Sequence, residues 1–462
     1  MICPTARPTI PLPSWHPNPS QQLLLQACLL PEEKAIQAFA EWWLTPTATR
    51  NDPASQRLLP LLWWRCSGRQ QGALNTVQRD EVASWKKAML RTWAHNQRRL
   101  SQANQIAALM GQARIPLLLV KGLPLALGAY GHLGLRPMAD LDLVVPDAQA
   151  RQGIEVLTAA GWSPLPTPLK GSDAPEAEKQ HPWIGRSRAL DDFSELYFRI
   201  RNGHGFSHPD GNEADLHWYV FHEQCDPGID SMVWDKAQSL QRWNRSRTPG
   251  VSPLLLMPDP TDHLLLVLSH ACRWEAAAPI RWVADAVLLL QAAAPFDWQR
   301  FVSLAQQRKL TATAHALLSY LQQQMEVDVP PNVLQELSLT PARHPNPSSI
   351  TRSLPNAQGG AEEILYLLRR WRRLRRDTTL RGGVPGFSTF VCHILGSPSR
   401  RALMRYAFSE WQRRRSSRTL CSRPSPADQR SFVGSNLRQD DASECQRYRS
   451  RSAGTNSRST PA

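Results

Sequence analysis

The spacing of apolar and polar residues divides the chain into segments of different kinds. From Gln21 to Met110, apolar residues recur every three or four positions between polar ones, as in the run from Glu81 to Met110. This period is typical of amphipathic α-helices. We therefore predict a helical region over residues 21–110, preceded by a Pro-rich segment over residues 1–20.

The helical period gives way to strand-like patterns in the middle of the chain. The continuous apolar run Ile115–Val120 predicts a buried strand, and the alternation of polar and apolar residues that begins Asp140–Val145 predicts a second one. Short helices are expected after each of these strands, over Leu123–Tyr130 and Ala148–Ala160. Strands and helices therefore alternate in this part of the chain.

Two more strands are expected after a loop that is rich in turn residues. They cover Asp192–Ile200 and Glu213–Val220, and a loop containing Gly203 and Gly205 joins them. After residue 226 the pattern is helical, and later it is Pro- and Ser-rich. The predicted fold class is α+β, with a small mixed β-sheet core over residues 111–226 between helical regions over 21–110 and 227–340. A linker and a basic amphipathic helix are expected over 341–396, and then a disordered Arg/Ser-rich tail over 397–462 with one short helical patch at Arg401–Trp411.

Positive charge is concentrated at the C-terminal end. Residues 361–462 contain 21 arginines, no lysine and eight acidic residues, so they carry +13 of the formal net charge of +15. The first 360 residues carry only +2, and the overall pI is therefore no argument that the central region binds nucleic acid. The basic helix and the tail can contact an anionic surface. For the helix we favour packing of its apolar stripe on the helical region, with its arginines in water.

The remaining composition narrows the class of protein. The eight cysteines are scattered without a C-x-x-C pair, which supports neither a zinc site nor a disulfide framework. The Pro-rich start lacks the apolar stretch of a secretory signal. The most apolar segment, Leu264–Leu290, is interrupted by charged residues, so no transmembrane segment is expected. We predict a cytoplasmic protein.

Three aspartates form the candidate metal site. Asp140 and Asp142 lie two positions apart on a predicted strand, so their side chains leave the same face. On the later strand, Asp215 and His217 share a face in the same way. If these strands are neighbours, the carboxylates of Asp140, Asp142 and Asp215 converge, and clustered carboxylates are the ligands that Mg²⁺ prefers. His217 is then expected next to the metal ligands.

Lys121-Gly122 lies where the first predicted strand turns into a helix. Glycine lets the backbone approach a phosphate closely, and the free N–H groups of a helix N-terminus favour an anion. Lys121 adds a positive charge. Arg136 is a further candidate, either for binding a triphosphate oxygen or for supporting a carboxylate of the site, with a surface arginine as the alternative. Lys121, Gly122 and Arg136 are therefore the candidate nucleotide-binding residues.

Two segments resemble the uncharacterised bacterial nucleotidyltransferase family of the DNA-polymerase-β-like superfamily: LLLVKGLPLALGAYGHLGLRPMADLDLVV and EADLHW. The helical segment Ile280–Asp285 also resembles that family's C-terminal half. From their i,i+4 spacing, Arg281 and Asp285 are expected to form a salt bridge, with a role in a substrate pocket as the alternative. In layout the likeness covers about residues 21–339.

The resemblance implies transfer of a nucleoside monophosphate from ATP or another NTP to a hydroxyl of an acceptor. Asp140 and Asp142 are then ligands of Mg²⁺, with Mn²⁺ as the alternative ion, and Asp215 completes the catalytic site. Lys121-Gly122-Leu123 stands where the wider superfamily has Gly-Ser or Gly-Gly, so the nucleotide that is preferred stays open. The acceptor also stays open: a protein, a small molecule or RNA.

Two other functions are compatible with parts of this pattern. D-x-D motifs also occur in glycosyltransferases that bind a nucleotide-sugar through Mn²⁺, but the Lys121-Gly122 turn before the motif disfavours them. The second alternative is a non-catalytic protein of nucleotidyltransferase fold that acts through its Arg-rich tail. The presence of all three acidic residues disfavours this alternative.

Overall fold

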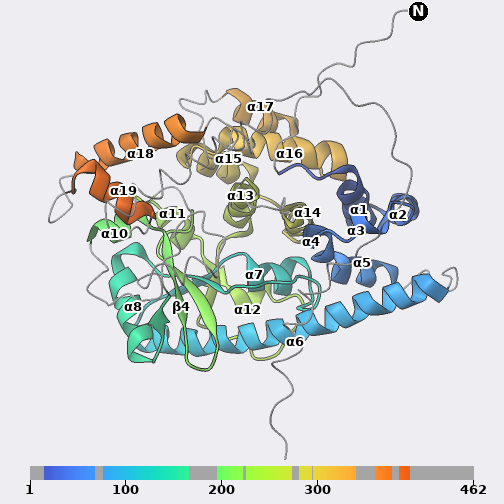
Figure 1. Cartoon of the computed structure of the whole chain (residues 1–462), viewed down its shortest axis with the longest axis horizontal. Helices are drawn as coiled ribbons and strands as arrows, with labels where there is room; N and C mark the ends of the chain where they lie inside the picture. The colour runs from blue at the N-terminus through green and yellow to red at the C-terminus, as the bar shows by residue number, and fades with distance from the viewer. Residues whose placement is uncertain are drawn as a thin grey trace, which may run out of the picture. The chain divides into compact units, whose positions relative to one another are not determined.

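The computed structural model describes residues 15–67, 76–165, 195–221, 225–272, 280–293, 295–339, 359–376 and 384–395 (Figure 1). The first 14 residues, most of the loop after Trp162, the linker over 340–358 and the tail from residue 396 lie outside these ranges. The helical patch predicted at Arg401–Trp411 therefore stays a prediction, as do the disorder of the tail and the domain boundaries.

The predicted N-terminal helical region is confirmed. The first helix begins where the sequence provides a capping box: Asn18 accepts a hydrogen bond from the Gln21 backbone, and the Gln21 side chain accepts one from the Asn18 backbone. Pro19 occupies the first turn, where its missing N–H group is not needed. The helices of this region are α1 (Pro19–Leu29), α2 (Glu32–Trp43), α3 (Thr47–Arg50), α4 (Pro53–Gln56), α5 (Leu59–Cys66) and the 37-residue α6 (Thr76–Gln112).

A mixed seven-stranded sheet follows, so the predicted α+β class is also confirmed. The pairs β2–β5 and β1–β7 are parallel, and the other pairs are antiparallel. In spatial order the strands are β3 (Ser163–Pro164), β4 (Gly203–Ser207), β5 (Glu213–His217), β2 (Asp142–Val144), β1 (Leu117–Leu119), β7 (Leu255–Met257) and β6 (Gln238–Ser239).

Each face of the sheet packs against a different set of helices. Leu117 and Leu143 belong to the hydrophobic cluster that contains the C-terminal half of α6 and the helix α8 (Ala150–Ala159), which follows the 3-10 turn η2 (Asp147–Gln149). Leu118 and Val144 point the other way, into a cluster formed by helices from before and after the sheet. Because side chains alternate along a strand, Asp142 lies on the face of Val144.

The helices after the sheet share this second cluster with the N-terminal helices. α1 packs against α14 and α16, so the two helical regions form a continuous layer over one face of the sheet (Figure 1). None of the helices that the structure describes combines the length and apolar character needed to span a membrane. The helices of this part are α11 (Ser231–Asp235), α12 (Leu240–Trp243), α13 (Pro260–Ala271), α14 (Arg281–Ala292), α15 (Trp298–Gln307), α16 (Thr311–Met325) and α17 (Pro331–Leu339).

Two predictions about the segment before strand β5 were wrong. The expected strand Asp192–Ile200 is a helix, α10 (Glu195–Ile200), in the residues that the structure describes. The expected loop through Gly203 and Gly205 is instead strand β4, which forms five antiparallel residue pairs with β5. Glycine disfavours a strand when considered alone, but the ladder of hydrogen bonds to β5 outweighs this local preference. Strands β6 and β7 were also missed, because Leu255–Met257 is a short apolar run that a helix would equally favour.

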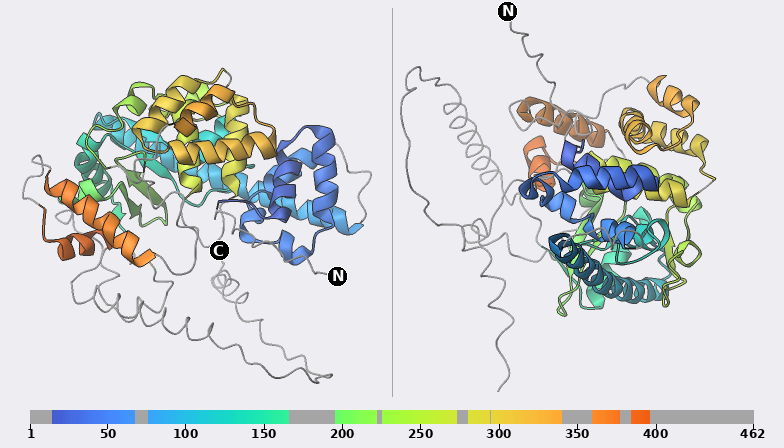
Figure 2. Two further views of the ribbon diagram at one scale, coloured as in Figure 1. Left: turned by 90° about the horizontal axis from the view of Figure 1, so that it is seen from above. Right: turned by 90° about the vertical axis from the view of Figure 1, so that its right-hand side faces the viewer.

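A basic helix near residue 361 is confirmed as α18 (Gly359–Arg375), followed by α19 (Phe387–Leu395). Figure 2 shows these two helices side by side next to α10. The expectation that α18 packs on the helical region over 227–340 was wrong, because Leu374 packs with Phe390 of α19 and Ile200 of α10. These residues form a small hydrophobic cluster separate from the two larger ones.

Candidate functional site

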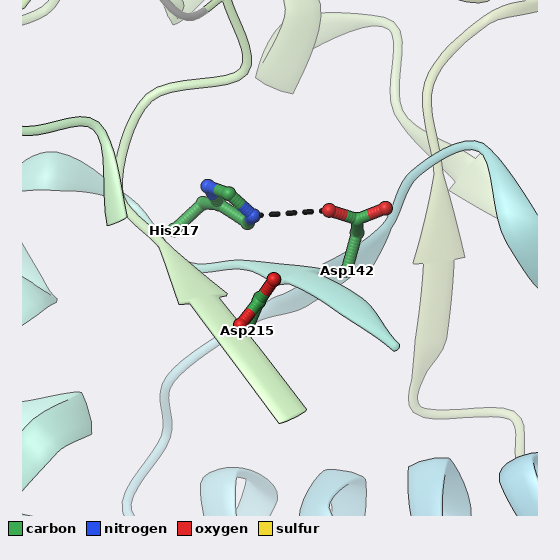
Figure 3. Close-up of side chains that lie close together, drawn as sticks. All are labelled: Asp142, Asp215 and His217. Atoms are coloured by element: carbon green, nitrogen blue, oxygen red, sulfur yellow. Dashed lines mark hydrogen bonds and ion pairs between the residues drawn. The ribbon is translucent and has the colours of Figure 1, made fainter. Parts of the chain in front are cut away.

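The pairing of β2 with β5 brings the acidic side chains together. These strands are parallel neighbours, with Asp142 opposite Asp215 and Val144 opposite His217. One ligand atom from each of Asp142, Asp215 and His217 lies within 4.8 Å of the other two (Figure 3). The three side chains therefore converge on one point above the sheet, as predicted for Asp142 and Asp215. Two carboxylates and an imidazole are suitable ligands for a divalent cation.

Two glycines of β4 leave space beside this point. Gly203 is paired with His217, and Gly205 is paired with Asp215. A Cβ atom at Gly203 would lie 2.4 Å from Nδ1 of His217, and one at Gly205 would lie 3.1 Å from Oδ1 of Asp215. Any larger residue would therefore press on the side chains of the site. A glycine inside a strand often marks such a close approach.

Asp142 is the most constrained carboxylate of the site. Its side chain is 8% exposed, Nζ of Lys121 lies 2.9 Å from Oδ2, and Nε2 of His217 lies 3.1 Å from Oδ1. Burial alone would raise the pKa of Asp142, but the Lys121 ammonium group and the hydrogen bond from His217 hold it well below its usual range. Asp142 is therefore an anion throughout the physiological range of pH.

His217 is oriented from its other side by Asn202. The side-chain amide Nδ2 of Asn202 donates to Nδ1 of His217 at 3.1 Å. With Nδ1 as an acceptor, the ring proton is on Nε2 and is donated to Asp142. His217 therefore positions the Asp142 carboxylate, in agreement with its predicted place next to the metal ligands. Asn202 was missed by sequence analysis because it lies in the segment that was expected to be a loop.

Asp215 differs from Asp142 in its affinity for protons. Burial raises the pKa of Asp215, and the negative charges of Asp142 and Asp140 raise it further, against the opposing effect of His217. Two neighbouring carboxylates therefore have pKa values displaced in opposite directions. The neighbouring negative charges that raise the pKa of Asp215 would be neutralised by a bound cation.

Asp140 lies in the loop just before β2 and is exposed. It is not one of the three residues whose ligand atoms meet within 4.8 Å. Arg99 of α6 holds this loop next to β5, since its guanidinium group donates to the carbonyl oxygen of Ala139 at 2.6 Å and to that of Glu213 at 2.7 Å. The role of Asp140 as a metal ligand therefore stays a prediction.

Lys121 has an unusual backbone conformation, with φ of 55° and ψ of −100°. A residue other than glycine adopts a positive φ only where its surroundings stabilise it. The Lys121 N–H donates to Nε2 of His263 at 2.9 Å, and His263 is fully buried in α13. Burial lowers the pKa of His263 to about 3, so that its ring is neutral and can accept this bond. This contact stabilises the backbone of Lys121, whose side chain reaches Asp142.

Gly122 begins the short helix α7 (Gly122–Pro124), which continues into the π-helical turn η1 (Leu125–Ala129). A Cβ atom there would lie 3.1 Å from Sδ of Met138, in the loop that leads to Asp142. Glycine thus allows the turn after β1 and the loop before β2 to pack together. His263 was missed by sequence analysis because it lies within an apolar helical run and carries no local motif.

Arg136 is buried, and its guanidinium group is paired with Asp285. Its Nε and Nη2 atoms each lie 2.8 Å from an oxygen of Asp285 in α14. The expected pair between Arg281 and Asp285 was therefore wrong: Arg281 donates instead to the carbonyl oxygen of Pro137 at 2.5 Å. Asp285 attracts Arg136 because a buried bidentate pair satisfies more hydrogen-bonding groups than an i,i+4 contact.

Comparison with known proteins identifies a family. Residues 54–326 match the model of a protein family described as an uncharacterised nucleotidyltransferase. The matched residues include Lys121, Asp142, Asp215 and helices α13 and α14. No curated protein matches the chain.

Proposed function

Because the chain belongs to the uncharacterised nucleotidyltransferase family, we propose that it transfers a nucleoside monophosphate from an NTP to a hydroxyl group of an acceptor. The observation that carries this proposal is the register of β2 and β5, which sets Asp142 beside Asp215. Nζ of Lys121 lies 2.9 Å from Oδ2 of Asp142. A cluster of carboxylates next to a lysine matches the needs of a reaction between a metal-bound triphosphate and a hydroxyl.

The donor set fits a divalent metal ion, for which we propose Mg²⁺, with Mn²⁺ as the alternative. Asp142 and Asp215 would hold the ion, and Asp140, at the end of the loop anchored by Arg99, would supply the third carboxylate. The bound ion would neutralise the triphosphate and favour ionisation of the acceptor hydroxyl. His217 positions the Asp142 carboxylate through its Nε2–H group.

The transfer step that we propose exchanges one P–O bond for another. The acceptor oxygen forms a bond to the α-phosphorus of the NTP, the bond from this phosphorus to the oxygen that bridges to the β-phosphate breaks, and pyrophosphate leaves. The proton of the hydroxyl passes to the carboxylate of Asp215, which lies beside Asp142 in the paired strands.

Lys121 and Gly122 are proposed to bind the triphosphate. In the absence of nucleotide, the Lys121 ammonium group neutralises Asp142. When metal and triphosphate bind, the same group would turn to the β- or γ-phosphate, whose charge it complements. Arg136 is proposed to act indirectly, because its buried pair with Asp285 holds the loop that carries Asp140.

The proposal is tested with the full-length protein and α-labelled NTPs, in Mg²⁺ or Mn²⁺, on small hydroxyl compounds, RNA and cell extract. We expect label transfer that EDTA abolishes and that Asp142→Asn reduces by more than a hundredfold, while circular dichroism shows that the variant is still folded. Asp235→Asn, which alters an exposed carboxylate of α11, is the matched control. Metal-dependent NTP binding that survives in Asp142→Asn would refute the assignment of the metal site.

A further inference from the structure

His217 turns a ring nitrogen towards the candidate metal site. Its Nε2 atom lies 3.1 Å from Oδ1 of Asp142, and the two groups point towards one another (Figure 3). Neighbouring ligands of an octahedral ion with bonds of about 2.1 Å lie about 3 Å apart. The separation of the two atoms is therefore already that of a pair that shares an ion, with the ion in place of the proton between them.

The other members of the cluster leave this position open to an ion. Lys121 contacts Oδ2 of Asp142, so Oδ1 is the oxygen that faces His217. Asp215 places an oxygen within 4.8 Å of the ligand atoms of both other residues. Asp140 is exposed and does not belong to this cluster. The side chain that completes the cluster around the two paired aspartates is therefore an imidazole.

The start of β4 holds the ring of His217 in this orientation. A Cβ atom at Gly203 would lie 2.4 Å from Nδ1, so the ring packs closely on the glycine backbone. Asn202 precedes this glycine, and its carbonyl oxygen accepts hydrogen bonds from the N–H groups of Trp218 and Tyr219. The backbone of Asn202 is thereby anchored to the end of β5, while its side-chain amide lies 3.1 Å from Nδ1 of His217.

We propose that His217 is a nitrogen ligand of the metal ion, so that the site prefers a first-row transition-metal ion such as Mn²⁺ to Mg²⁺. This inference rests on the proposed function and concerns the ion of the same site. Imidazole is a suitable ligand for transition metals, whereas Mg²⁺ prefers oxygen. Among the divalent ions of the first row, Mn²⁺ binds nitrogen ligands most weakly, and it is therefore the most demanding probe of this preference.

Binding of the ion requires the other tautomer of His217. Without an ion, Nε2 carries the proton that bonds to Asp142. When Nε2 becomes a ligand, this proton moves through water to Nδ1, so the ring stays neutral. The amide of Asn202 then rotates about its last side-chain bond, and its oxygen accepts the new Nδ1–H bond. A metal-bound histidine almost always donates its other ring N–H to an oxygen, so Asn202 is a positioning residue for both tautomers.

Pulsed electron paramagnetic resonance of the full-length protein, saturated with Mn²⁺, detects a nitrogen ligand directly. We expect modulation from a bound ¹⁴N nucleus that changes when the histidines are labelled with ¹⁵N and that is lost in His217→Gln. The matched control is His208→Gln in the turn between β4 and β5, which should keep the signal. Modulation that is absent from the wild type, or unchanged in His217→Gln, would overturn the proposal.

Calorimetric titration with two ions distinguishes a ligand from a group that only orients Asp142. Glutamine at position 217 keeps an amide that can donate to Asp142 but offers no imidazole nitrogen. In His217→Gln we expect the affinity for Mn²⁺ to fall about tenfold and that for Mg²⁺ to change by less than about threefold, because only Mn²⁺ gains from the nitrogen. Equal losses for the two ions would overturn the proposal, since a group that only orients Asp142 supports both ions alike.

Two variants of Asn202 test the hydrogen bond behind the ring. Asn202→Leu removes this bond and should lower the ratio of Mn²⁺ affinity to Mg²⁺ affinity about tenfold, as is usual for partners of metal-bound histidines. Asn202→Asp keeps an oxygen that accepts from Nδ1–H and should retain the ratio of the wild type. An equal fall of the ratio in both variants would overturn the proposed arrangement.

The same measurements separate this inference from the proposed function. If both ions bind to the wild type, neither binds to Asp142→Asn and no nitrogen is detected, the ion is held by oxygen ligands alone. This inference is then wrong, and the proposed function stands. If neither ion binds to the wild type in the presence of an NTP, the metal site itself is wrong, and the proposed function fails with it.

Discussion

Arg136 and Asp285 form a buried, bidentate ion pair across 149 positions of sequence, with both N–O distances equal to 2.8 Å. Arg136 lies in the loop before β2, and Asp285 lies in α14. The hydroxyl group of Tyr130 donates to the same carboxylate at 2.8 Å. Burial alone would raise the pKa of Asp285, but Arg136 holds it below its usual value. The pair therefore fastens the loop that precedes Asp142 to the helical layer.

We expect Asp285→Asn to destabilise the fold. The amide keeps the shape of the side chain but leaves the Arg136 guanidinium group buried without a counter-charge. Removing one partner of a buried pair typically costs about 3–5 kcal/mol. Urea unfolding measures this loss, with Asp235→Asn on the exposed side of α11 as the control for a charge change. Equal stability of the two variants would show that the ion pair does not secure the loop.

We expect Gly203→Ala to damage the site from the neighbouring strand. The new Cβ atom would lie 2.4 Å from Nδ1 of His217 and 2.9 Å from the carbonyl oxygen of Leu216, so the ring or the strand must move. Overpacking of this kind costs about 1–3 kcal/mol. Metal affinity and melting temperature should both fall. The control is Gly386→Ala, where no heavy atom lies within 4 Å of the added carbon and no change is expected.

Much of the site could be predicted from alternation along two strands. A period of two places Asp142 on one face of β2, and Asp215 and His217 on one face of β5. The structure pairs these strands in the register that brings the three side chains together. The Lys121-Gly122 turn could be placed because a buried apolar run ends there. These predictions depend only on local geometry.

The rest depends on contacts between distant residues. Lys121 and His263 are 142 positions apart, and nothing near His263 in the sequence distinguishes it from other residues of an apolar helix. The strand β4 contains Gly203 and Gly205, which are typical of loops, and only its pairing with β5 reveals their role. The partner of Asp285 was predicted wrongly for the same reason. Arg281 is near Asp285 in sequence, whereas Arg136 is near it in space.

We expect His263 to make stability depend on pH. The ordinary pKa of histidine is 6.5, and in the folded protein burial lowers that of His263 to about 3. Between these values the unfolded chain binds a proton that the folded chain does not, so stability falls as the pH decreases below 6.5, by up to about 1.4 kcal/mol per pH unit. His263→Gln retains an oxygen that can accept the Lys121 N–H bond and has no such titration.

Urea unfolding of wild type and His263→Gln at pH 7, 6 and 5 checks this expectation. The difference in free energy between the two proteins should change in favour of the variant as the pH is lowered. Carboxyl groups with raised pKa values, such as Asp262, titrate in both proteins, and their contributions cancel in the difference. A difference that is constant from pH 7 to pH 5 would contradict a neutral, buried His263.

Lys121 is expected to affect metal and nucleotide binding in opposite directions. Its ammonium group lies 2.9 Å from Oδ2 of Asp142, where it neutralises a carboxylate that we assign to the metal ion. In Lys121→Met the apolar part of the side chain is kept and the charge is lost. Without nucleotide, Asp142 should then bind Mn²⁺ roughly tenfold more tightly, since a hydrogen bond to a charged group contributes about 1.5–3 kcal/mol.

The same variant should bind NTP more weakly, and the loss should exceed that for the corresponding NMP, because Lys121 is proposed to neutralise the outer phosphates. Calorimetric titration with Mn²⁺ alone, and then with each nucleotide in the presence of Mn²⁺, measures both effects. Lys87→Met, which alters an exposed lysine of α6, is the control and should change neither affinity. A fall in Mn²⁺ affinity would mean that Lys121 supports the metal site rather than competing with the ion. Equal losses for NTP and NMP would make Lys121 a structural residue of the turn, held there by His263.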